Sequence, residues 1–219
     1  DSVSRMVRQQ YEESPYPRWV KLRFPPVANS VAKVVNEANL QLHSEKIKSV
    51  SSPSILIAGC GTGQHSLETG SRFANCQVTA VDLSRKSLAY AQRASSELGI
   101  TNIRYLQADI LNLGVLRREF DIVESAGVLH HMDNPMAGWS VLVGLLKTGG
   151  LMKIGLYSEL ARRHIAMTRE EISLQKVGTS EADIRQFRQS LIESHHKHHK
   201  SFHSPTLTKL LYYIVFPFL

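Results

Sequence analysis

The sequence is poor in cysteine and has no long apolar run. Its two cysteines, Cys60 and Cys76, are too few for a disulfide framework and lack the spacing of a zinc knuckle or a redox pair. So few cysteines favour a reducing compartment, and we expect a cytoplasmic protein. The longest apolar run, Leu210 to Leu219, is shorter than the roughly 20 residues that cross a bilayer. We therefore expect no membrane partner.

The chain also lacks a secretory signal, an internal repeat and a dense block of basic charge. It begins at Asp1 without a basic and then apolar start, so we expect a segment cut from a longer protein rather than a secreted one. The formal net charge is +7, but lysine and arginine are spread along the chain and no aromatic-rich nucleic-acid signature accompanies them. We expect a solvated basic surface and no nucleic-acid partner.

Strand-like and helix-like segments alternate in the middle of the chain. Short apolar segments predict strands at residues 55–58, 77–81, 103–107, 121–125 and 151–157. Helical patterns lie between them at residues 64–74, 85–97 and 135–147. Short buried strands separated by helices are joined by right-handed crossovers. The order predicts an α/β fold with a doubly wound, Rossmann-like and mainly parallel sheet that carries helices on both faces.

Helical segments flank this core. Residues 2–12 and the amphipathic stretch 28–45 predict helices, and two prolines keep the Ser-Pro-Tyr-Pro-Arg-Trp segment between them irregular. Later, residues 160–174 and 181–192 have helical patterns and residues 210–218 are the one late strand candidate. We divide the chain into N-terminal helices and a lid (1–50), an α/β core (51–158), and a mostly helical extension (159–219). We expect this extension to be truncated.

Capping residues support several boundaries. Ser84 and Gly99 suit the start and end of the 85–97 helix. Asn134 or Asp133 with Pro135 suits the start of the next helix, and Gly149-Gly150 its end. Thr179 or Ser180 can begin the last helix.

Residues just after the strands are the candidate site, because ligands of an open parallel sheet bind at the carboxyl ends of the strands. The first strand runs into Gly59-Cys60-Gly61-Thr62-Gly63. Glycines at alternate positions let the backbone turn sharply and approach a ligand, while the next helix presents its N-terminal amides. An ordinary tight turn uses the same residues, so this loop alone is weak evidence for a ligand-binding site.

Two acids follow the next strands. Asp82 ends the second strand, where its carboxylate can accept both hydroxyls of a ribose or cap the following helix. Asp109 follows the third strand and can accept a hydrogen bond from an adenine amino group, although alone it is an ordinary loop aspartate. Leu83 and Ile110 are the predicted apolar walls.

Small residues and two histidines follow the fourth strand. The strand runs into Ser125-Ala126-Gly127 and then, after two residues, into His130-His131. Taken together and in this order, the four places resemble the class I S-adenosylmethionine-dependent methyltransferases over about residues 50–158. The resemblance implies S-adenosylmethionine as the cofactor.

The resemblance also implies a role for each matching residue. The glycine loop, with Gly59, Cys60, Gly61, Thr62 and Gly63, would cradle the methionine part. Asp82 would hold the ribose, Asp109 would read adenine, and the turn at Ser125 and Ala126 would face the sulfonium.

One position departs from the family pattern. Many members carry an acid two residues before the first glycine, in contact with the amino end of the cofactor, where this chain has Ile57. This variant and the leading segment from Tyr11 to Trp19 are similar to methyltransferase domains found behind tetratricopeptide repeats. The similarity implies a repeat region in a longer parent chain. The closing antiparallel strands of the family are not evident after residue 158.

Methyl transfer is a displacement at a carbon activated by a sulfonium, so the protein contributes mainly positioning and exclusion of water. A base is needed only where the acceptor must lose a proton. His130 and His131 are the candidates for that base, although histidines after a buried strand often only hydrogen-bond nearby backbone. Tyr16, Trp19 and Tyr157 are the candidates for an acceptor pocket, and Trp19 can equally anchor the N-terminal helix.

The acceptor class is narrowed by two absences. No Asn/Asp-Pro-Pro-Tyr/Phe follows the fourth strand, and neither cysteine lies where a cytosine-C5 nucleophile would. Methylation of nucleic-acid bases is therefore disfavoured. The acceptor atom can still be an oxygen, nitrogen or sulfur atom of a small molecule or of a protein side chain.

Other functions stay open as well. A nicotinamide-dependent dehydrogenase shares the sheet and the ribose acid, but its Gly-x-Gly-x-x-Gly needs glycine where this chain has Gln64. A module that binds S-adenosylmethionine without catalysis is the other alternative. The histidine-rich run at residues 195–203 can hold a transition metal, but its interleaved lysines favour a solvated segment, and we assign no metal.

Overall fold

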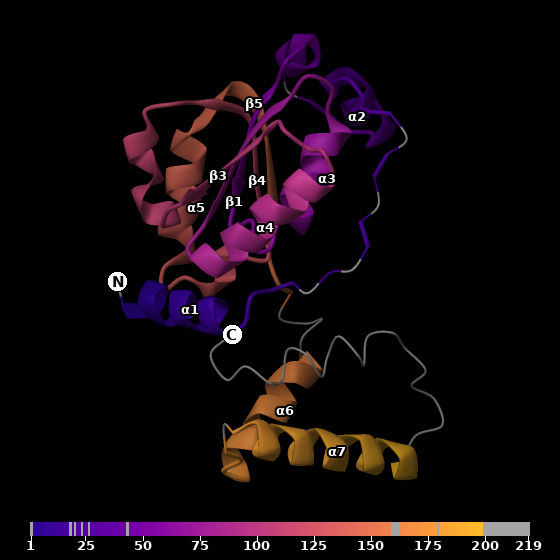
Figure 1. Ribbon diagram of the computed structural model, residues 1–219, viewed down its shortest axis with the longest axis vertical. Coiled ribbons are helices and arrows are strands. Elements are labelled where there is room, and N and C mark those ends of the chain that lie inside the picture. Colours follow the sequence, from indigo (N-terminus) through magenta and orange to yellow (C-terminus); the bar gives the residue numbers. More distant parts are fainter. Residues whose placement is uncertain are drawn as a thin grey trace. The chain divides into compact units, whose positions relative to one another are not determined.

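The computed structural model describes residues 2–17, 19, 21–22, 24–25, 27–42, 44–158, 163–178 and 180–198. The chain divides into two compact units, Asp1–Leu156 and Tyr157–Leu219 (Figure 1). The first unit contains the sheet, and the described part of the second is helical.

A five-stranded parallel sheet forms the centre of the first unit (Figure 1). Its strands are β1 (Ser54–Ala58), β2 (Gln77–Asp82), β3 (Ile103–Gln107), β4 (Phe120–Ala126) and β5 (Leu146–Gly155). Their order in space is β3-β2-β1-β4-β5, and every pairing is parallel. The order reverses between β1 and β4, which makes the gap beyond their carboxyl ends the switch point of the sheet. The predicted Rossmann-like α/β fold is confirmed.

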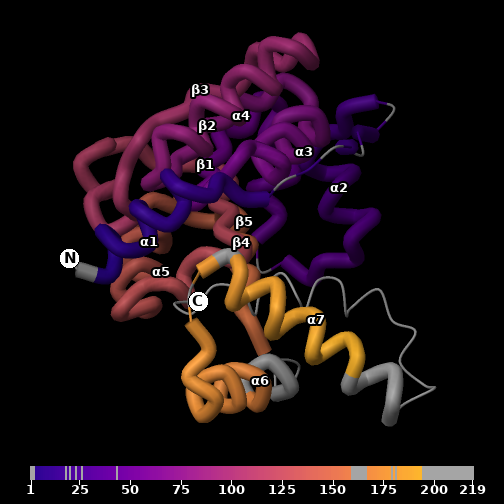
Figure 2. Tube along the Cα trace, turned by 60° about the horizontal axis from the view of Figure 1, so that its bottom comes forward, coloured from indigo at the N-terminus to yellow at the C-terminus, as the bar shows by residue number. Residues whose placement is uncertain are grey.

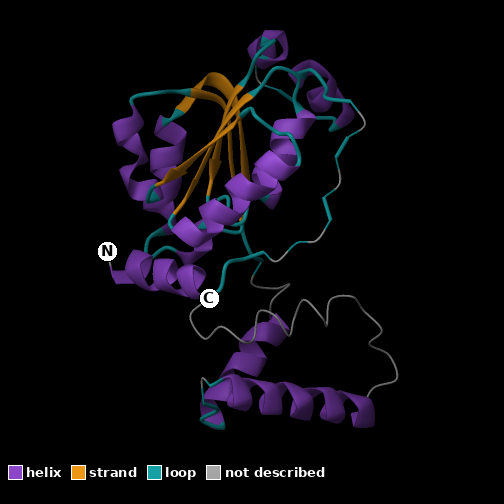
Figure 3. Cartoon of the chain, in the orientation of Figure 1, coloured by secondary structure: helices purple, strands orange, loops and turns teal. Residues whose placement is uncertain are grey.

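Helices cover both faces of the sheet (Figure 3). One face carries α2 (Val31–Glu37), α3 (Gln64–Arg72) and α4 (Arg85–Glu97), and the other carries η2 (Ile110–Leu116), η3 (Leu129–His131) and α5 (Pro135–Gly144). Side chains of a strand alternate between the faces, so Ile55 and Ile57 of β1 join one core while Leu56 and Ala58 join the other. Because both faces of the central strands are buried, their sequences are nearly continuous apolar runs and do not alternate with polar residues.

The caps of the central helices agree with the sequence-based predictions. The hydroxyl of Ser84 accepts a hydrogen bond from the Ser87 amide at the start of α4, and Gly99 follows the end of α4 with φ +68°. The side chain of Asn134 accepts from the Ala137 amide at the start of α5. These side chains satisfy amides that a helix start leaves without partners.

Two predicted helices are too long. The stretch 28–45 is helical only in α2, because Asn39 adopts a left-handed φ of +50° that ends the helix, and a short η1 (Glu45–Ser49) follows. The helix predicted at 135–147 ends at Gly144, and β5 begins at Leu146. Gly149 and Gly150 therefore lie within β5 instead of ending a helix, beside an irregularity in the β4–β5 register.

The N-terminal helix α1 (Ser2–Glu13) packs beside α4. Figure 2, turned so that this end of the unit comes forward, shows α1 across the strand ends. In the second unit, α6 (Arg163–Leu174) and α7 (Glu181–His198) confirm two predicted helices, and Ser180 caps α7 by accepting from the Asp183 amide. The strand candidate at 210–218 lies outside the described residues. Within the described part, no helix combines the length and the apolar character needed to cross a membrane.

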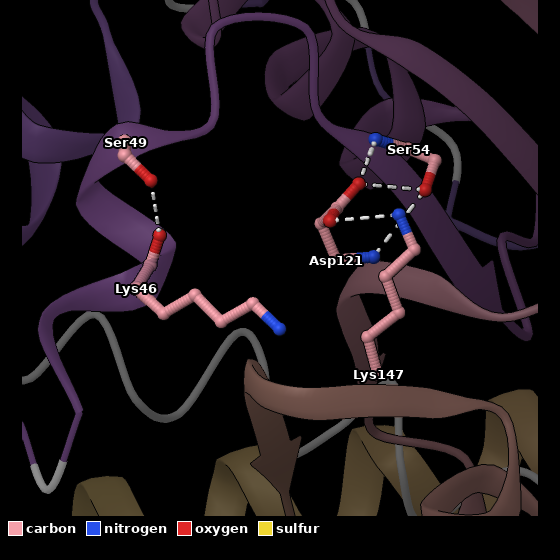
Figure 4. A network of polar contacts seen from close by, with 5 residues as sticks. All are labelled: Lys46, Ser49, Ser54, Asp121 and Lys147. Carbon is pink, nitrogen blue, oxygen red and sulfur yellow. Dashed lines mark hydrogen bonds and ion pairs between the residues drawn. The ribbon is translucent and has the colours of Figure 1, made fainter.

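A buried carboxylate ties the amino ends of three neighbouring strands together (Figure 4). Asp121 of β4 accepts hydrogen bonds from the amide and the hydroxyl of Ser54 in β1, both at 2.8 Å, and pairs with Lys147 of β5 at 2.9 Å. Burial favours a raised pKa of Asp121. The hydrogen bond and positive charge of Lys147 and the two hydrogen bonds from Ser54 outweigh this effect and lower the pKa below its ordinary value.

We expect Asp121→Asn to lower the free energy of unfolding by about 1 to 3 kcal/mol at neutral pH, the usual cost of unmade buried polar contacts. Because the folded-state pKa of Asp121 is depressed, its contribution is present above the ordinary pKa and is lost as the pH falls through the folded-state pKa. The difference between wild type and variant should therefore shrink in acid. Urea unfolding at several pH values measures it.

The control is Glu97→Gln, which removes an exposed ion pair with Arg93 in α4. Such surface pairs contribute about 0 to 1 kcal/mol, so this variant should stay close to wild type. Equal stability of the two variants at neutral pH would show that Asp121 does not hold the strand ends together.

Candidate functional site

The glycine loop between β1 and α3 is built on left-handed backbone. Gly59, Gly61 and Gly63 have φ values of +79°, +53° and +95°. A Cβ at Gly61 would lie 2.5 Å from the carbonyl oxygen of Tyr16, and one at Gly63 would lie 2.6 Å from the Cβ of Ala91 in α4. Glycine at these positions therefore permits close approach of other segments as well as the turn itself.

Asp82 joins the glycine loop to the start of α4. Its Oδ2 accepts a hydrogen bond from the Gly61 amide at 2.8 Å, and its Oδ1 accepts from the Ser84 amide at 2.9 Å. Burial raises the pKa of Asp82, an effect that these amides oppose. The alternative role predicted for Asp82, capping the following helix, belongs to Ser84, and Asp82 accepts from the amide of that cap residue. Each carboxylate oxygen can accept more than one hydrogen bond, so capacity for a ribose remains.

Asp109 and its neighbours lie next to Asp82. The amide of Ala108 donates to the carbonyl oxygen of Asp82 at 3.1 Å, which brings the ends of β2 and β3 together. Asp109 begins η2, where its Oδ1 accepts from the Leu111 amide. Ile110 is buried and Leu83 is half-buried. The fold therefore gathers the residues predicted to hold the nucleoside at one edge of the sheet.

The two site residues predicted at the end of β4, Ser125 and Ala126, have different surroundings. Ser125 is fully buried, and its hydroxyl donates to the carbonyl oxygen of Ala58 in β1 at 3.0 Å. Ala126 is exposed at the last position of the strand. The following His130 and His131 lie in η3, half-buried, with ring centroids 4.0 Å apart in an edge-on arrangement. The Ser125 hydroxyl therefore links β4 to β1, while its backbone lies opposite Ile154 in the pairing of β4 with β5.

The segment after α1, residues 14–17 and 19, is held on the glycine loop, and we call it the strap. The Thr62 amide donates to the carbonyl oxygen of Tyr16, the Thr62 hydroxyl donates to that of Pro17, and the Trp19 indole Nε1 donates to that of Thr62. The Trp19 ring packs edge-on against Tyr90 of α4, 5.5 Å between centroids. Trp19 thus anchors the strap to both the loop and α4.

The end of α1 is attached to the start of α4 as well. The carboxylate of Glu12 accepts hydrogen bonds from the amides of Arg85 at 2.6 Å and Lys86 at 3.3 Å. The hydroxyl of Ser84 donates to the carbonyl oxygen of Tyr11. An acidic side chain at a helix N-terminus is stabilised by the free amides and the helix dipole. α1 and the strap therefore form one attachment along the strand ends.

A buried glutamate paired with a half-buried histidine, which the sequence analysis missed, lies beside the loop. Glu124 of β4 is within 2.5 Å of His65 Nε2 in α3 and accepts from the Thr69 hydroxyl at 3.0 Å. Burial favours a raised pKa of Glu124, but the hydrogen bond and charge of His65, with Lys153 and Thr69, hold this pKa below its ordinary value. The available signal was Glu124 itself, a charged residue in the middle of a strand that is otherwise mostly apolar.

The remaining predicted residues lie elsewhere. Tyr157 is exposed and belongs to the second unit, so its role in a pocket stays a prediction. The histidine-rich run falls on the end of α7 and on residues whose side chains are not described. Among the described residues, no three histidine, cysteine, aspartate or glutamate side chains cluster closely enough to hold a metal.

Comparison with known proteins finds similarity to methyltransferases. A sequence family described as a methyltransferase domain matches residues 55–150. An uncharacterized protein of Synechococcus sp. is 30% identical over 175 residues, which is 80% of this chain and 42% of that protein. (S)-Coclaurine N-methyltransferase of Papaver somniferum is 30% identical over 115 residues, 52% of this chain and 32% of that enzyme. The chain thus spans less than half the length of either relative.

A solved structure shares the fold. PKMT2 from Rickettsia typhi has a TM-score of 0.58 at 20% identity, over 88% of this chain and 37% of that one. Together, the family match and the fold support a class I S-adenosylmethionine-dependent methyltransferase domain, with S-adenosylmethionine as the cofactor. The resemblance to domains fused to tetratricopeptide repeats stays a prediction.

We expect Gly61→Ala to detach the strap. Alanine at a left-handed φ costs about 1 to 2 kcal/mol, and here its Cβ would also press on the Tyr16 carbonyl oxygen 2.5 Å away. Gly99→Ala is the matched control, because Gly99 also has a positive φ but nothing lies within 4 Å of its Cβ. Both variants should lose thermal stability, and only Gly61→Ala should expose residues 1–20 to trypsin. Equal protection in both would contradict the close contact.

Proposed function

We propose that this chain binds S-adenosylmethionine at the carboxyl ends of β1, β2 and β4 and transfers its methyl group to an oxygen, nitrogen or sulfur atom. The observation that carries the proposal is the hydrogen bond from the Gly61 amide to Asp82, because it joins a left-handed glycine loop to a carboxylate on the adjacent strand. A loop and an acid placed in this way suit a ligand that combines a charged end with a ribose.

The proposed cofactor roles follow the order of the strands. The loop from Gly59 to Gly63, with Cys60 and Thr62, would receive the methionine part beside the N-terminus of α3. Asp82 would accept the ribose hydroxyls on its remaining lone pairs, and Asp109 would accept from the adenine amino group. Leu83 and Ile110 would border the adenine.

The reacting methyl group would lie near the end of β4. Because the Ser125 hydroxyl is bonded to Ala58, we propose that the backbone of Ser125 and the exposed Ala126 face the sulfonium. The displacement needs positioning and exclusion of water more than acid or base chemistry. His130 and His131 are the proposed bases for an acceptor that must lose a proton.

The strap would serve as a lid over the loop. Its hydrogen bonds to Thr62 support this role, and they combine the lid with the anchoring role of Trp19. Tyr16 and Trp19 would border the acceptor, which we propose to be a small molecule or a protein side chain. The name of the poppy relative, which acts on coclaurine, supports a small molecule. A tetratricopeptide-repeat region in the parent chain and a cytoplasmic location stay predictions.

Calorimetric titration with S-adenosylhomocysteine and with NAD tests the proposed cofactor. We expect the first to bind and NAD to produce no heat of binding. Asp82→Asn should weaken S-adenosylhomocysteine by about 1 to 3 kcal/mol, because one carboxylate oxygen and the charge are lost. The thermal stability of the ligand-free variant separates this loss from loop damage. Binding of NAD instead, or undiminished affinity in a folded variant, would refute the assignment.

A second test concerns the strap. Trp19→Phe keeps an aromatic ring near Tyr90 but removes the indole donor to Thr62, so we expect S-adenosylhomocysteine to bind about 2- to 12-fold more weakly, the range of one neutral hydrogen bond. Trp139→Phe makes the same exchange in α5 and should leave affinity unchanged. If the two variants bind alike while only Trp19→Phe is less stable, Trp19 is an anchor without a part in the lid.

A further inference from the structure

The pair formed by His65 and Glu124 has no part in the roles proposed so far. His65 Nε2 and Glu124 Oε2 are 2.5 Å apart, and the Thr69 hydroxyl donates to the same oxygen. The Glu124 side chain is 4% exposed, whereas that of His65 is 22% exposed. The carboxylate is therefore enclosed, and the imidazole is the part of the pair that a ligand can reach.

The position of the pair matches the switch point of the sheet. His65 lies in the first turn of α3, two residues after Gly63, and Glu124 lies two residues before the end of β4. β1 leads into the glycine loop and α3, and β4 is the strand on the other side of the reversal. The pair thus joins the two sides of the crevice in which an open parallel sheet binds its ligand.

Structural needs alone do not favour this arrangement. A histidine in the first turn of a helix stands at the positive end of the helix dipole, where added positive charge is unfavourable. A buried carboxylate is costly unless it is paired and hydrogen-bonded, and an apolar residue in β4 would avoid that cost. The first turn of a helix does favour an anionic ligand, and a nearby carboxylate favours a cationic one.

The register adds a second observation. Glu124 is paired with Ile57 of β1 on one side and with Lys153 of β5 on the other. Residues paired in register point to the same face, so the carboxylate stands one strand away from Ile57 at the same level. This chain therefore has a carboxylate below the glycine loop, supplied by β4 instead of β1.

We propose that His65, held in place by Glu124, binds the amino-acid end of the cofactor, which carries an ammonium and a carboxylate. This inference rests on the proposed function. His65 contacts the ligand, and Glu124 is a positioning residue that orients the imidazole through Nε2. The pair selects ligands that have the amino-acid end over ligands that have only the adenosine.

Two probes separate this role from a structural one. S-adenosylhomocysteine and 5′-methylthioadenosine share the adenosine and the sulfur, and only the first has the amino-acid end. We expect His65→Ala and Glu124→Gln to weaken S-adenosylhomocysteine about 10- to 100-fold in calorimetry, the range of a hydrogen bond to a charged group. Affinity for 5′-methylthioadenosine should change less than about twofold.

Asp121→Asn is the matched control, because it alters another buried, paired carboxylate of the same strand at the opposite end. It should leave both affinities unchanged. Unchanged binding of S-adenosylhomocysteine in His65→Ala, or an equal loss for both probes, overturns the inference. If Glu124→Gln does not fold, His65→Ala decides alone. Wild-type protein that binds neither probe would refute the proposed function itself.

Discussion

Two backbone amides converge on the carboxylate of Asp82, and the candidate site depends on this convergence. The amide of Gly61 belongs to the loop after β1, and the amide of Ser84 belongs to the start of α4 after β2. A partly buried carboxylate needs such donors, and the amides of a loop with positive φ values need acceptors, so each stabilises the other. The ends of two neighbouring strands are thereby held in one arrangement before any ligand arrives.

The buried charges of β4 divide between the two ends of the sheet. At the amino end, Asp121 is satisfied by Ser54 and Lys147, and it links three strands. At the carboxyl end, Glu124 is satisfied by His65 and Thr69 of α3. The ligands of an open parallel sheet bind at the carboxyl ends of its strands. One carboxylate therefore supports the architecture, and the other lies where chemistry can occur.

The strap shows how a segment without regular structure becomes part of the site. Pro17 accepts a hydrogen bond from Thr62 through its carbonyl oxygen, and Trp19 returns one from its indole. Gly61 allows the Tyr16 carbonyl oxygen to come close, because a side chain there would occupy the same space. The glycine loop thus has two neighbours to accommodate, the strap and the proposed ligand, which accounts for its lack of side-chain bulk.

The sequence by itself determined the succession of strands and helices along the chain, the position of the glycine loop and the place of Asp82 after a strand. Apolar periodicity, caps and turn residues act over a few neighbouring positions, so they can be recognised locally. Two helix ends differ from the local pattern: α2 ends at Glu37 because Asn39 is left-handed, and α5 ends at Gly144 because the pairing of β5 with β4 outweighs the helical pattern. Only the tertiary structure decided that His65 meets Glu124, 59 positions away. Such contacts depend on strand order and register, and these are set by the packing of the whole sheet rather than by any local stretch of sequence.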